Sequence, residues 1–445
     1  MWQFSLIYLL GSSCIWYAID QPLGHYDVDS WGYSSIAEHF VSTGTLTDPH
    51  HPESAPIQPV GYPFFVGACF RLFGIDIRPV LMLQITLMCI ALMLCMMIAK
   101  RIAGTKVAYI TGIFFLLTLG FYIYPQLLLA ESLLVVMLLC MLDRYIFFVQ
   151  SGDICSLSIA GLAAGISMII KPTVMLCILF LCACTYYVAR IRQQKSHMRA
   201  FVSVAILLFS FTVPTGLYIM RNYMHYGYVA FAPMMQLNMY QIFLSKVMGS
   251  LADTDPQEII ETQLRFKGQH NFDTSGWDDA RKLLIHHIQE YPLLCARIWL
   301  LNVAKSWLGL YVTQFKKMIE PTHCVKGHSY FDQTGDFLQR MRTYIEGGTS
   351  YVQLKLLGWY ECIWGLLRLI LAFIGFIFLY KKDRFYALFL LSICIAFSLP
   401  TGIDGCCRYR IVFEPVLLLF SAIGLLKIYE HFFNNKKEQR YGVFG

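Results

Sequence analysis

Charged residues are scarce in this 445-residue sequence: Asp, Glu, Lys and Arg make up 14% of it, against roughly 25% in soluble domains. With 57% hydrophobic residues and a mean hydropathy of +0.54, this scarcity excludes an ordinary soluble domain. The sequence also lacks a P-loop, a G-x-G-x-x-G motif, an internal repeat and an N-x-S/T sequon. Its 15 cysteines include no recurring C-x-x-C pair at zinc-ligand spacing. Nothing therefore indicates a nucleotide-binding or zinc module, and the missing sequon favours a bacterial source.

What the sequence contains instead is a series of long apolar runs, such as 80–99, 127–142 and 201–217. About 20 apolar residues suffice to cross a hydrocarbon core roughly 30 Å thick. About ten spans are predicted, at 4–19, 79–99, 107–124, 126–148, 157–170, 173–190, 201–219, 356–380, 385–401 and 411–430. The first run has no basic n-region or A-x-A site, so we expect a retained span rather than a signal peptide. The predicted fold class is an all-α polytopic membrane protein.

Lys and Arg gather in short loops between these runs, and such loops mark the cytoplasmic side of a membrane. The clusters are Lys100, Arg101 and Lys106; Arg144; Arg190, Arg192, Lys195 and Arg199; Lys381, Lys382 and Arg384; and Lys436, Lys437 and Arg440. With the N-terminus inside, every cluster falls on the cytoplasmic side. The net charge of +7 is therefore a topology signal, and no nucleic-acid partner is predicted.

This threading leaves two long segments, 20–78 and 221–352, outside the cytoplasm. Each contains an apolar stretch, at 62–73 and 288–312, that is too short or too interrupted by basic residues to span, so we expect helices lying on the membrane surface. The expected organisation is 1–19 first span; 20–78 outer catalytic loop; 79–220 spans; 221–352 long outer loop; 353–433 C-terminal spans; and 434–445 cytoplasmic tail. Any active site should then face the periplasm from a bacterial inner membrane.

The stretch 27–38 carries acids followed by apolar residues at helical spacing, which predicts an amphipathic helix along the membrane surface. Asp29 would lie at its start, with Ser30 available for capping. Asp29 has two possible roles at this point: a functional carboxylate, or simply the N-cap that Asp fills well. The short D-x-D pattern is common and indicates a metal only weakly.

Several short motifs occur in a definite order along the chain. They are Asp29-Ser30-x-x-Tyr33-x-x-Ile36-Ala37; Pro59-Val60-Gly61-Tyr62-Pro63; Ala130-Glu131; Gly165-x5-Lys171-Pro172-Thr173; Arg221-Asn222-Tyr223-x3-Gly227; and Arg408-Tyr409-Arg410 with Pro415. Together they resemble the GT-C glycosyltransferases, in particular the protein-mannosyltransferase and aminoarabinose-transferase superfamily, which uses polyprenyl-phosphate sugars. The resemblance implies a GT-C-like transmembrane bundle.

The resemblance also implies site residues. Asp29 would be the general base for an acceptor hydroxyl in an inverting displacement, and Asp27, Tyr33, Tyr62 and Glu131 would contact substrate. In the aminoarabinose-transferase branch an Arg often lies three residues after the Asp and a Lys precedes the Pro-rich motif. Those places hold Gly32 and Gln58 here, so two expected phosphate contacts are missing.

The remaining candidates for donor phosphate are Lys171, Arg221, Arg408 and Arg410, all at predicted outer ends of spans. Arg408 and Arg410 precede or open a helix whose N-terminal dipole disfavours cations, and a bound anion would offset that cost. The alternative for Arg410 is an ion pair with Glu414, although Arg before Glu is the poorer order for such a pair.

No cofactor is predicted. A divalent metal is an alternative. Its ligands would come from a set of outer residues, namely His25, His50, His51, Glu53, His323, Cys324 and His328. The expected partners are a polyprenyl-phosphate sugar donor, the lipid bilayer, and an acceptor that is a glycan, a lipid or a protein. A lipid-linked glycan polymerase or ligase is a close alternative. A transporter or flippase is another, disfavoured because the spans are expected to be largely free of central charge.

Overall fold

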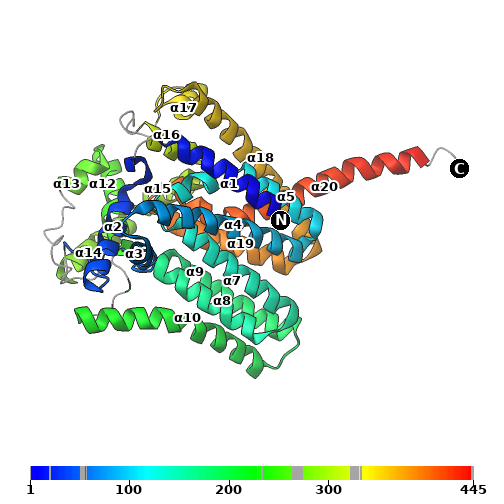
Figure 1. Ribbon diagram of the computed structural model, residues 1–445, viewed down its shortest axis with the longest axis horizontal. Coiled ribbons are helices and arrows are strands. Elements are labelled where there is room, and N and C mark those ends of the chain that lie inside the picture. Colours follow the sequence, from blue (N-terminus) through cyan, green and yellow to red (C-terminus); the bar gives the residue numbers. More distant parts are fainter. Residues whose placement is uncertain are drawn as a thin grey trace.

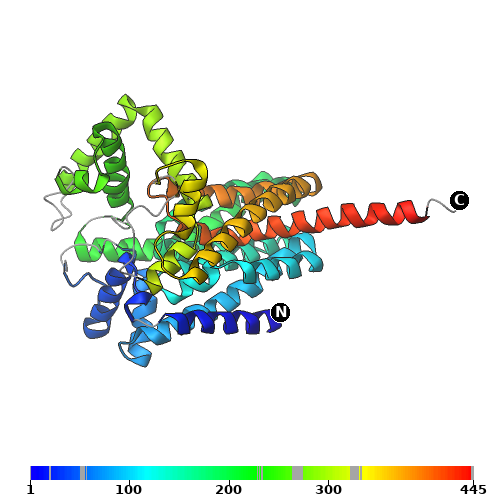
Figure 2. The ribbon, with the colours of Figure 1, turned by 90° about the horizontal axis from the view of Figure 1, so that it is seen from above.

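The structure, a computed structural model, is helical throughout the part of the chain that it describes. It describes residues 2–19, 22–50, 56, 58–227, 229, 231, 234–262, 274–320, 330 and 333–441. Long helices run side by side along the longest axis of the molecule (Figure 1). Both termini lie at one end of this bundle, which we call the terminal end, and α2 and α3 lie at the other, which we call the site end (Figure 2).

Each of the ten predicted spans falls on a long helix or a pair of consecutive helices. The helices are α1 (Trp2–Ala18), α4 (Ile77–Ala103), α5 (Thr105–Leu117) with α6 (Gly120–Ile123), α7 (Glu131–Ser151), α8 (Ile154–Ile170), α9 (Met175–Tyr187), α10 (His197–Tyr226), α18 (Val352–Lys382), α19 (Arg384–Ser398) and α20 (Glu414–Tyr441). By length and hydropathy, 7 helices in the described residues qualify as spans, or up to 9 if each of two bent pairs counts as one. The predicted all-α polytopic fold is confirmed.

Shorter helices occupy the site end. They are α2 (Val28–Thr43), α3 (Gly61–Phe73), α12 (Leu244–Ala252), α13 (Pro256–Thr262), α14 (Thr274–Glu290), α15 (Pro292–Leu308), α16 (Val312–Ile319) and α17 (Phe337–Glu346). The connections α4–α5, α7–α8, α9–α10 and α18–α19, which carry predicted basic clusters, lie at the terminal end (Figures 1 and 2). The two ends of the bundle therefore differ in charge as well as in structure.

Small residues allow the long helices to approach closely. A Cβ added at Gly375 of α18 would collide with the carbonyl of Phe420 on α20, and one at Gly424 with the carbonyl of Leu371. In a bilayer, where lipid is as apolar as a leucine side chain, helix association depends on such close packing. The α18–α20 pair is consequently a rigid support for the segment that precedes α20.

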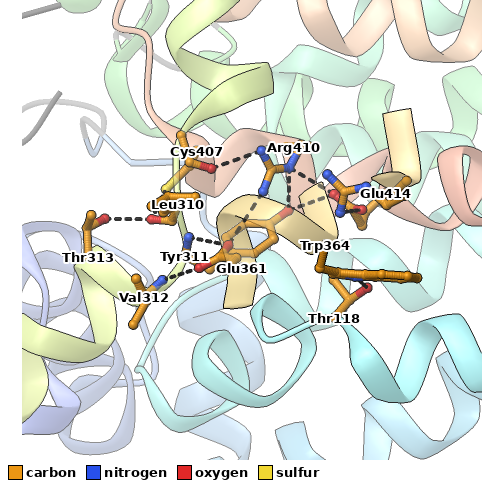
Figure 3. Close-up of polar contacts among 12 residues, drawn as sticks. Thr118, Leu310, Tyr311, Val312, Thr313, Glu361, Trp364, Cys407, Arg410 and Glu414 are labelled. Carbon is orange, nitrogen blue, oxygen red and sulfur yellow. Dashed lines mark hydrogen bonds and ion pairs between the residues drawn. The ribbon is translucent and has the colours of Figure 1, made fainter. Parts of the chain in front are cut away.

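The apolar stretch 288–312, predicted to hold a surface helix, contains α15, and a bend follows this helix. α15 ends at Leu308, and α16 begins at Val312 after a bend of 74°. At the bend, carbonyl groups at the end of α15 and amide groups at the start of α16 have no partner within their own helix. Buried side chains form hydrogen bonds with these groups instead (Figure 3). Arg410 donates to the carbonyls of Trp307 and Gly309, while Glu361 accepts from the amides of Tyr311 (2.6 Å) and Val312 (2.7 Å).

The expectation that the spans are largely free of central charge also needs correction. Glu361 and Arg368 both lie in α18, and Arg368 is at its middle with 1% of its surface exposed. Arg368 pairs with Glu414 at the start of α20, and Arg410 pairs with the same carboxylate at 2.9 Å. We call Glu361, Arg368, Arg410 and Glu414 the buried ionic network. Its members face the bundle interior and one another, as charges at membrane depth must.

Candidate active site

Asp29 lies in the first turn of α2, but it is not the cap of that helix. The N-cap is Asp27, whose carboxylate accepts from the Val28 amide while the Ser30 hydroxyl accepts from the Asp27 amide, forming a capping box. α2 ends at Thr43, and the C-cap that follows is Gly44, whose φ of 77° is the left-handed conformation that glycine adopts readily. Because Asp27 caps α2, the carboxylate of Asp29 is free for other contacts.

The partner of Asp29 is Arg408, which lies 379 positions away in the 3-10 helix η9 (Cys407–Val412). The Nη2 atom of Arg408 donates to Oδ2 of Asp29 at 2.6 Å. Nη1 of the same guanidinium lies 3.7 Å from Oδ2 of Asp27, and Nε lies 3.1 Å from Oε1 of Glu131. Burial alone would lower the pKa of Arg408, but the carboxylates of Glu131 and Asp29 outweigh burial and raise it well above its ordinary value. Arg408 is thus a permanent cation.

A second cation, Lys171, joins the same group from the end of α8. Its Nζ donates to Oε1 of Glu131 at 2.7 Å and lies 4.8 Å from the ring centroid of Tyr409. Glu131, the first residue of α7, is 2% exposed and bridges the two cations. We call Asp27, Asp29, Glu131, Lys171 and Arg408 the Asp29 cluster. It joins three carboxylates and two cations from four helices.

Tyr33 and Tyr62 lie beneath this cluster as packing residues. Both are buried, and their rings meet edge to face with centroids 4.8 Å apart. The Tyr62 hydroxyl donates to Gln84 Oε1 at 2.6 Å, and the amide of Gln84 donates to the carbonyls of Pro125 and Leu127. Burial holds the pKa of Tyr33 well above its ordinary value, so its phenol stays neutral. The contacts of Tyr62 position the chain just before Glu131, which supports the cluster indirectly.

Gln58 is a site residue that the sequence motifs did not identify as a contact. Its Nε2 donates to the carbonyl of Asp29 at 3.2 Å, and it packs against Gly32. Its Oε1 is buried without a hydrogen-bond partner in the described part of the chain. The only signal in the sequence was the departure from the family pattern at 32 and 58.

Two predicted site residues lie elsewhere. Arg221, near the end of α10, donates to the carbonyl of Leu46 and to Oδ1 of Asn222 at 2.8 Å, and no contact between described residues brings it to the Asp29 cluster. Arg410 belongs to the buried ionic network and is 3% exposed (Figure 3). This geometry favours the alternative of pairing with Glu414 over phosphate binding, because the guanidinium is enclosed by groups that it already binds.

Metal ligands do not gather among the described residues: no group of three His, Cys, Asp or Glu side chains there could hold an ion. His25 instead binds the carbonyl of Gln126 through Nδ1 at 2.7 Å. Other members of the alternative metal site lie outside the described residues, namely His51, Glu53, His323, Cys324 and His328.

Part of the chain matches a known family model. Residues 57–218, which include Gln58, Glu131 and Lys171, match the family model described as dolichyl-phosphate-mannose-protein mannosyltransferase. No curated protein matches the sequence.

The fold is similar to that of solved membrane enzymes. One is the oligosaccharyltransferase AglB from Archaeoglobus fulgidus in complex with an inhibitory peptide and a dolichol-phosphate, at 11% identity and a TM-score of 0.54, covering 99% of this chain and 51% of that one. The apo form of the Archaeoglobus fulgidus oligosaccharyltransferase gives 12% identity, a TM-score of 0.56, and 99% and 52% coverage. The chain therefore spans about half the length of these enzymes. ArnT from Cupriavidus metallidurans in the apo state gives 12% identity, a TM-score of 0.41, and 94% and 77% coverage.

The family match and the shared fold confirm the resemblance predicted from the motifs. The chain is a multi-pass membrane protein with the GT-C glycosyltransferase fold.

Proposed function

We propose that this protein transfers a sugar from a polyprenyl-phosphate-linked donor to an acceptor hydroxyl at the Asp29 cluster. The observation that carries the proposal is the 2.6 Å contact between Arg408 and Asp29, which places an anion-binding group directly beside a carboxylate that α2 does not need for capping. The family match and the GT-C fold support the same reaction class.

The donor phosphate would bind at Arg408 and Lys171. Arg matches phosphate geometry well, and the guanidinium of Arg408 lies with Lys171 beside the three carboxylates of the cluster. An incoming phosphate competes with Asp29 for the guanidinium. Binding of the donor would thereby release the Asp29 carboxylate at the moment when a base is needed.

Asp29 would then accept the proton of the acceptor hydroxyl. The acceptor oxygen forms a bond to the anomeric carbon as the bond from that carbon to the phosphate oxygen breaks. The electron pair leaves with the polyprenyl phosphate, whose added charge Arg408 and Lys171 stabilise. A single in-line displacement of this kind inverts the anomeric centre. A positioned base typically contributes about 10²–10⁴-fold to such a step.

We place the site on the periplasmic face of a bacterial inner membrane. The support is the charge difference between the ends of the bundle: the basic connections share the terminal end, and such loops stay in the cytoplasm. The site end would then meet a membrane-borne donor at the outer surface. The acceptor in this proposal is a hydroxyl of an envelope glycan, a lipid or a protein.

The test uses purified protein in proteoliposomes with a panel of radiolabelled undecaprenyl-phosphate sugars. The wild-type chain should consume a donor, whereas Asp29→Asn should lose at least about 10²-fold in turnover while still binding undecaprenyl phosphate. Asp76→Asn is the control, since Asp76 is another aspartate at a helix start of the site end, where it caps α4 and is not part of the Asp29 cluster. Near-normal turnover by Asp29→Asn would remove the assignment, and donor that is moved across the bilayer but never consumed would identify a transporter.

A further inference from the structure

Tyr409, the residue after Arg408 in η9, lies against both cations of the Asp29 cluster. The Nζ atom of Lys171 is 4.8 Å from the centroid of its ring, and the Cζ atom of Arg408 is 5.6 Å from the same centroid. A cation within about 6 Å of an aromatic ring is attracted by the negative charge of the ring face. One ring therefore contacts both side chains to which the donor phosphate is assigned.

The same two cations also share one carboxylate oxygen. Lys171 Nζ lies 2.7 Å from Oε1 of Glu131, and Arg408 Nε lies 3.1 Å from it. The two positive charges are thus held close together, although like charges repel. Glu131 offsets this repulsion by neutralising positive charge, and Asp29 does the same for Arg408. A further carboxylate could hold the cations in place only by removing charge that a phosphate needs.

The ring of Tyr409 can hold the cations without neutralising them. Partial burial, followed by the nearby carboxylate of Asp404, raises the pKa of Tyr409 well above its ordinary value, so the phenol carries no charge. Its hydroxyl donates to Oδ2 of Asp404 over a long 3.4 Å. Asn302 fixes the backbone before this segment by donating to the carbonyls of Gly402 (2.8 Å) and Ile403 (3.1 Å). The segment that carries the ring is therefore anchored to α15.

We propose that Tyr409 is a positioning residue for the donor phosphate, and that its ring face holds Lys171 and Arg408 side by side for the anion. This inference rests on the proposed function. Without the ring, each cation is free to turn fully towards the carboxylates of the Asp29 cluster, and donor binding then has to undo those pairs. The ring acts by preorganising the two cations. Its contribution depends on the electron density of the ring face and not on the hydroxyl.

The first test separates the ring from the hydroxyl, in the purified full-length chain in phosphatidylcholine nanodiscs. The probe is undecaprenyl phosphate, and undecaprenol is the control ligand. Tyr409→Phe keeps the ring and should bind the probe within about twofold of wild type, whereas Tyr409→Leu should bind it about fivefold more weakly. Neither variant should change the affinity for undecaprenol. Tyr380→Leu is the matched control, because Tyr380 also lies against a guanidinium (Arg384, 5.5 Å) but at the terminal end.

A graded series tests the charge of the ring face directly. Phenylalanine derivatives with one, two or three ring fluorines, placed at position 409 by nonsense suppression, change the shape of the ring little but withdraw electron density from its face. The affinity for undecaprenyl phosphate should fall stepwise with each added fluorine, because the attraction of both cations weakens. Packing depends on shape and would give no such gradient.

Three outcomes would overturn the inference. Unchanged affinity in Tyr409→Leu would mean that the ring does not position the cations. Equal losses in Tyr409→Phe and Tyr409→Leu would assign the role to the hydrogen bond with Asp404, and a flat fluorine series would assign it to packing. Failure of the proposed function is distinguishable, because it appears as undecaprenyl phosphate binding that Arg408→Gln does not weaken. Binding that Arg408→Gln weakens and the Tyr409 variants do not would exclude only the role of Tyr409.

Discussion

Gly32 and Gln58 are in contact: a methyl group added at residue 32 would lie 2.4 Å from Oε1 of Gln58, whose Nε2 donates to the carbonyl of Asp29 at 3.2 Å. These are the two positions at which the sequence departs from the aminoarabinose-transferase pattern. The two departures therefore lie next to each other in the structure. Where the family pattern has an Arg and a Lys, this chain has a glycine and the neutral amide of Gln58, which packs against it. The amide oxygen, buried and without a partner in the described residues, faces this contact.

The first prediction concerns this pair. Gly32→Ala should displace the Gln58 amide and lower turnover roughly fivefold, the equivalent of about 1 kcal/mol for one lost hydrogen bond. Gly216→Ala is the matched control, since an added methyl at Gly216 of α10 meets no atom within 4 Å. Turnover in proteoliposomes and the unfolding temperature in detergent are the measurements.

A double variant that combines Gly32→Ala with Gln58→Ala tests whether the two residues act together. If the methyl group acts through Gln58, adding Gly32→Ala to Gln58→Ala should cost little further activity, because the side chain that it displaces is already absent. Contacting residues are expected to show such non-additivity. Fully additive losses would show that Gly32 and Gln58 act independently.

The second prediction concerns Arg408. Arg408→Gln should weaken undecaprenyl phosphate binding at least tenfold and destabilise the fold by about 3 kcal/mol, because it leaves buried Glu131 with Lys171 alone. Arg408→Lys should retain more stability but still bind the phosphate less well, since it loses the planar fork of the guanidinium. Arg78→Gln, which breaks an exposed pair with Asp76, should change neither quantity. Unchanged lipid-phosphate affinity in Arg408→Gln would contradict the assignment.

The third prediction reverses the expected role of Arg410. Because Arg410 holds the end of α15 and pairs with Glu414, Arg410→Ala should lower stability by about 3–5 kcal/mol, as removing one partner of a buried pair does. Arg342→Ala, which breaks an exposed pair with Glu346, should have little effect on thermal unfolding. An unchanged unfolding temperature together with weaker undecaprenyl phosphate binding would restore the phosphate-binding interpretation.

Hydropathy and charge were sufficient to predict the helical bundle because a membrane span is a local property: about 20 apolar residues with basic loops at one end. Hydropathy did not predict the break between α15 and α16. That break depends on Glu361 and Arg410 satisfying the freed backbone groups, and both lie far away in the sequence. No local pattern encodes such a contact.

The site could be predicted only in part, for the same reason. Motif order identified Asp29, Glu131, Lys171 and Arg408, which the structure brings together. It could not tell which aspartate caps α2, because Asp27 and Asp29 are both suitable and only the geometry decides. The rule that disfavours Arg before Glu in a pair at i and i+4 describes exposed helices, whereas Arg410 and Glu414 are buried and have further partners.

The fourth prediction uses a thiol beside Arg408 to report donor binding. A hydrogen bond from Cys407, followed by the nearby charge of Arg408, lowers the pKa of Cys406 to about 7, although its partial burial acts in the opposite direction. A lowered pKa means that the thiolate, the reactive form, is present at lower pH. Alkylation of Cys406 by iodoacetamide should therefore rise through a midpoint of about pH 7, and this phase should vanish in Cys406→Ser.

The position of that midpoint should respond to the occupant of Arg408. A phosphate bound there neutralises the guanidinium, so undecaprenyl phosphate should move the midpoint to higher pH, and Arg408→Gln should do the same without ligand. Undecaprenol, which lacks the phosphate, is the matched control and should leave the midpoint in place. A midpoint that undecaprenyl phosphate and undecaprenol shift equally would mean that the lipid chain, rather than an anion on Arg408, changes the surroundings of the thiol.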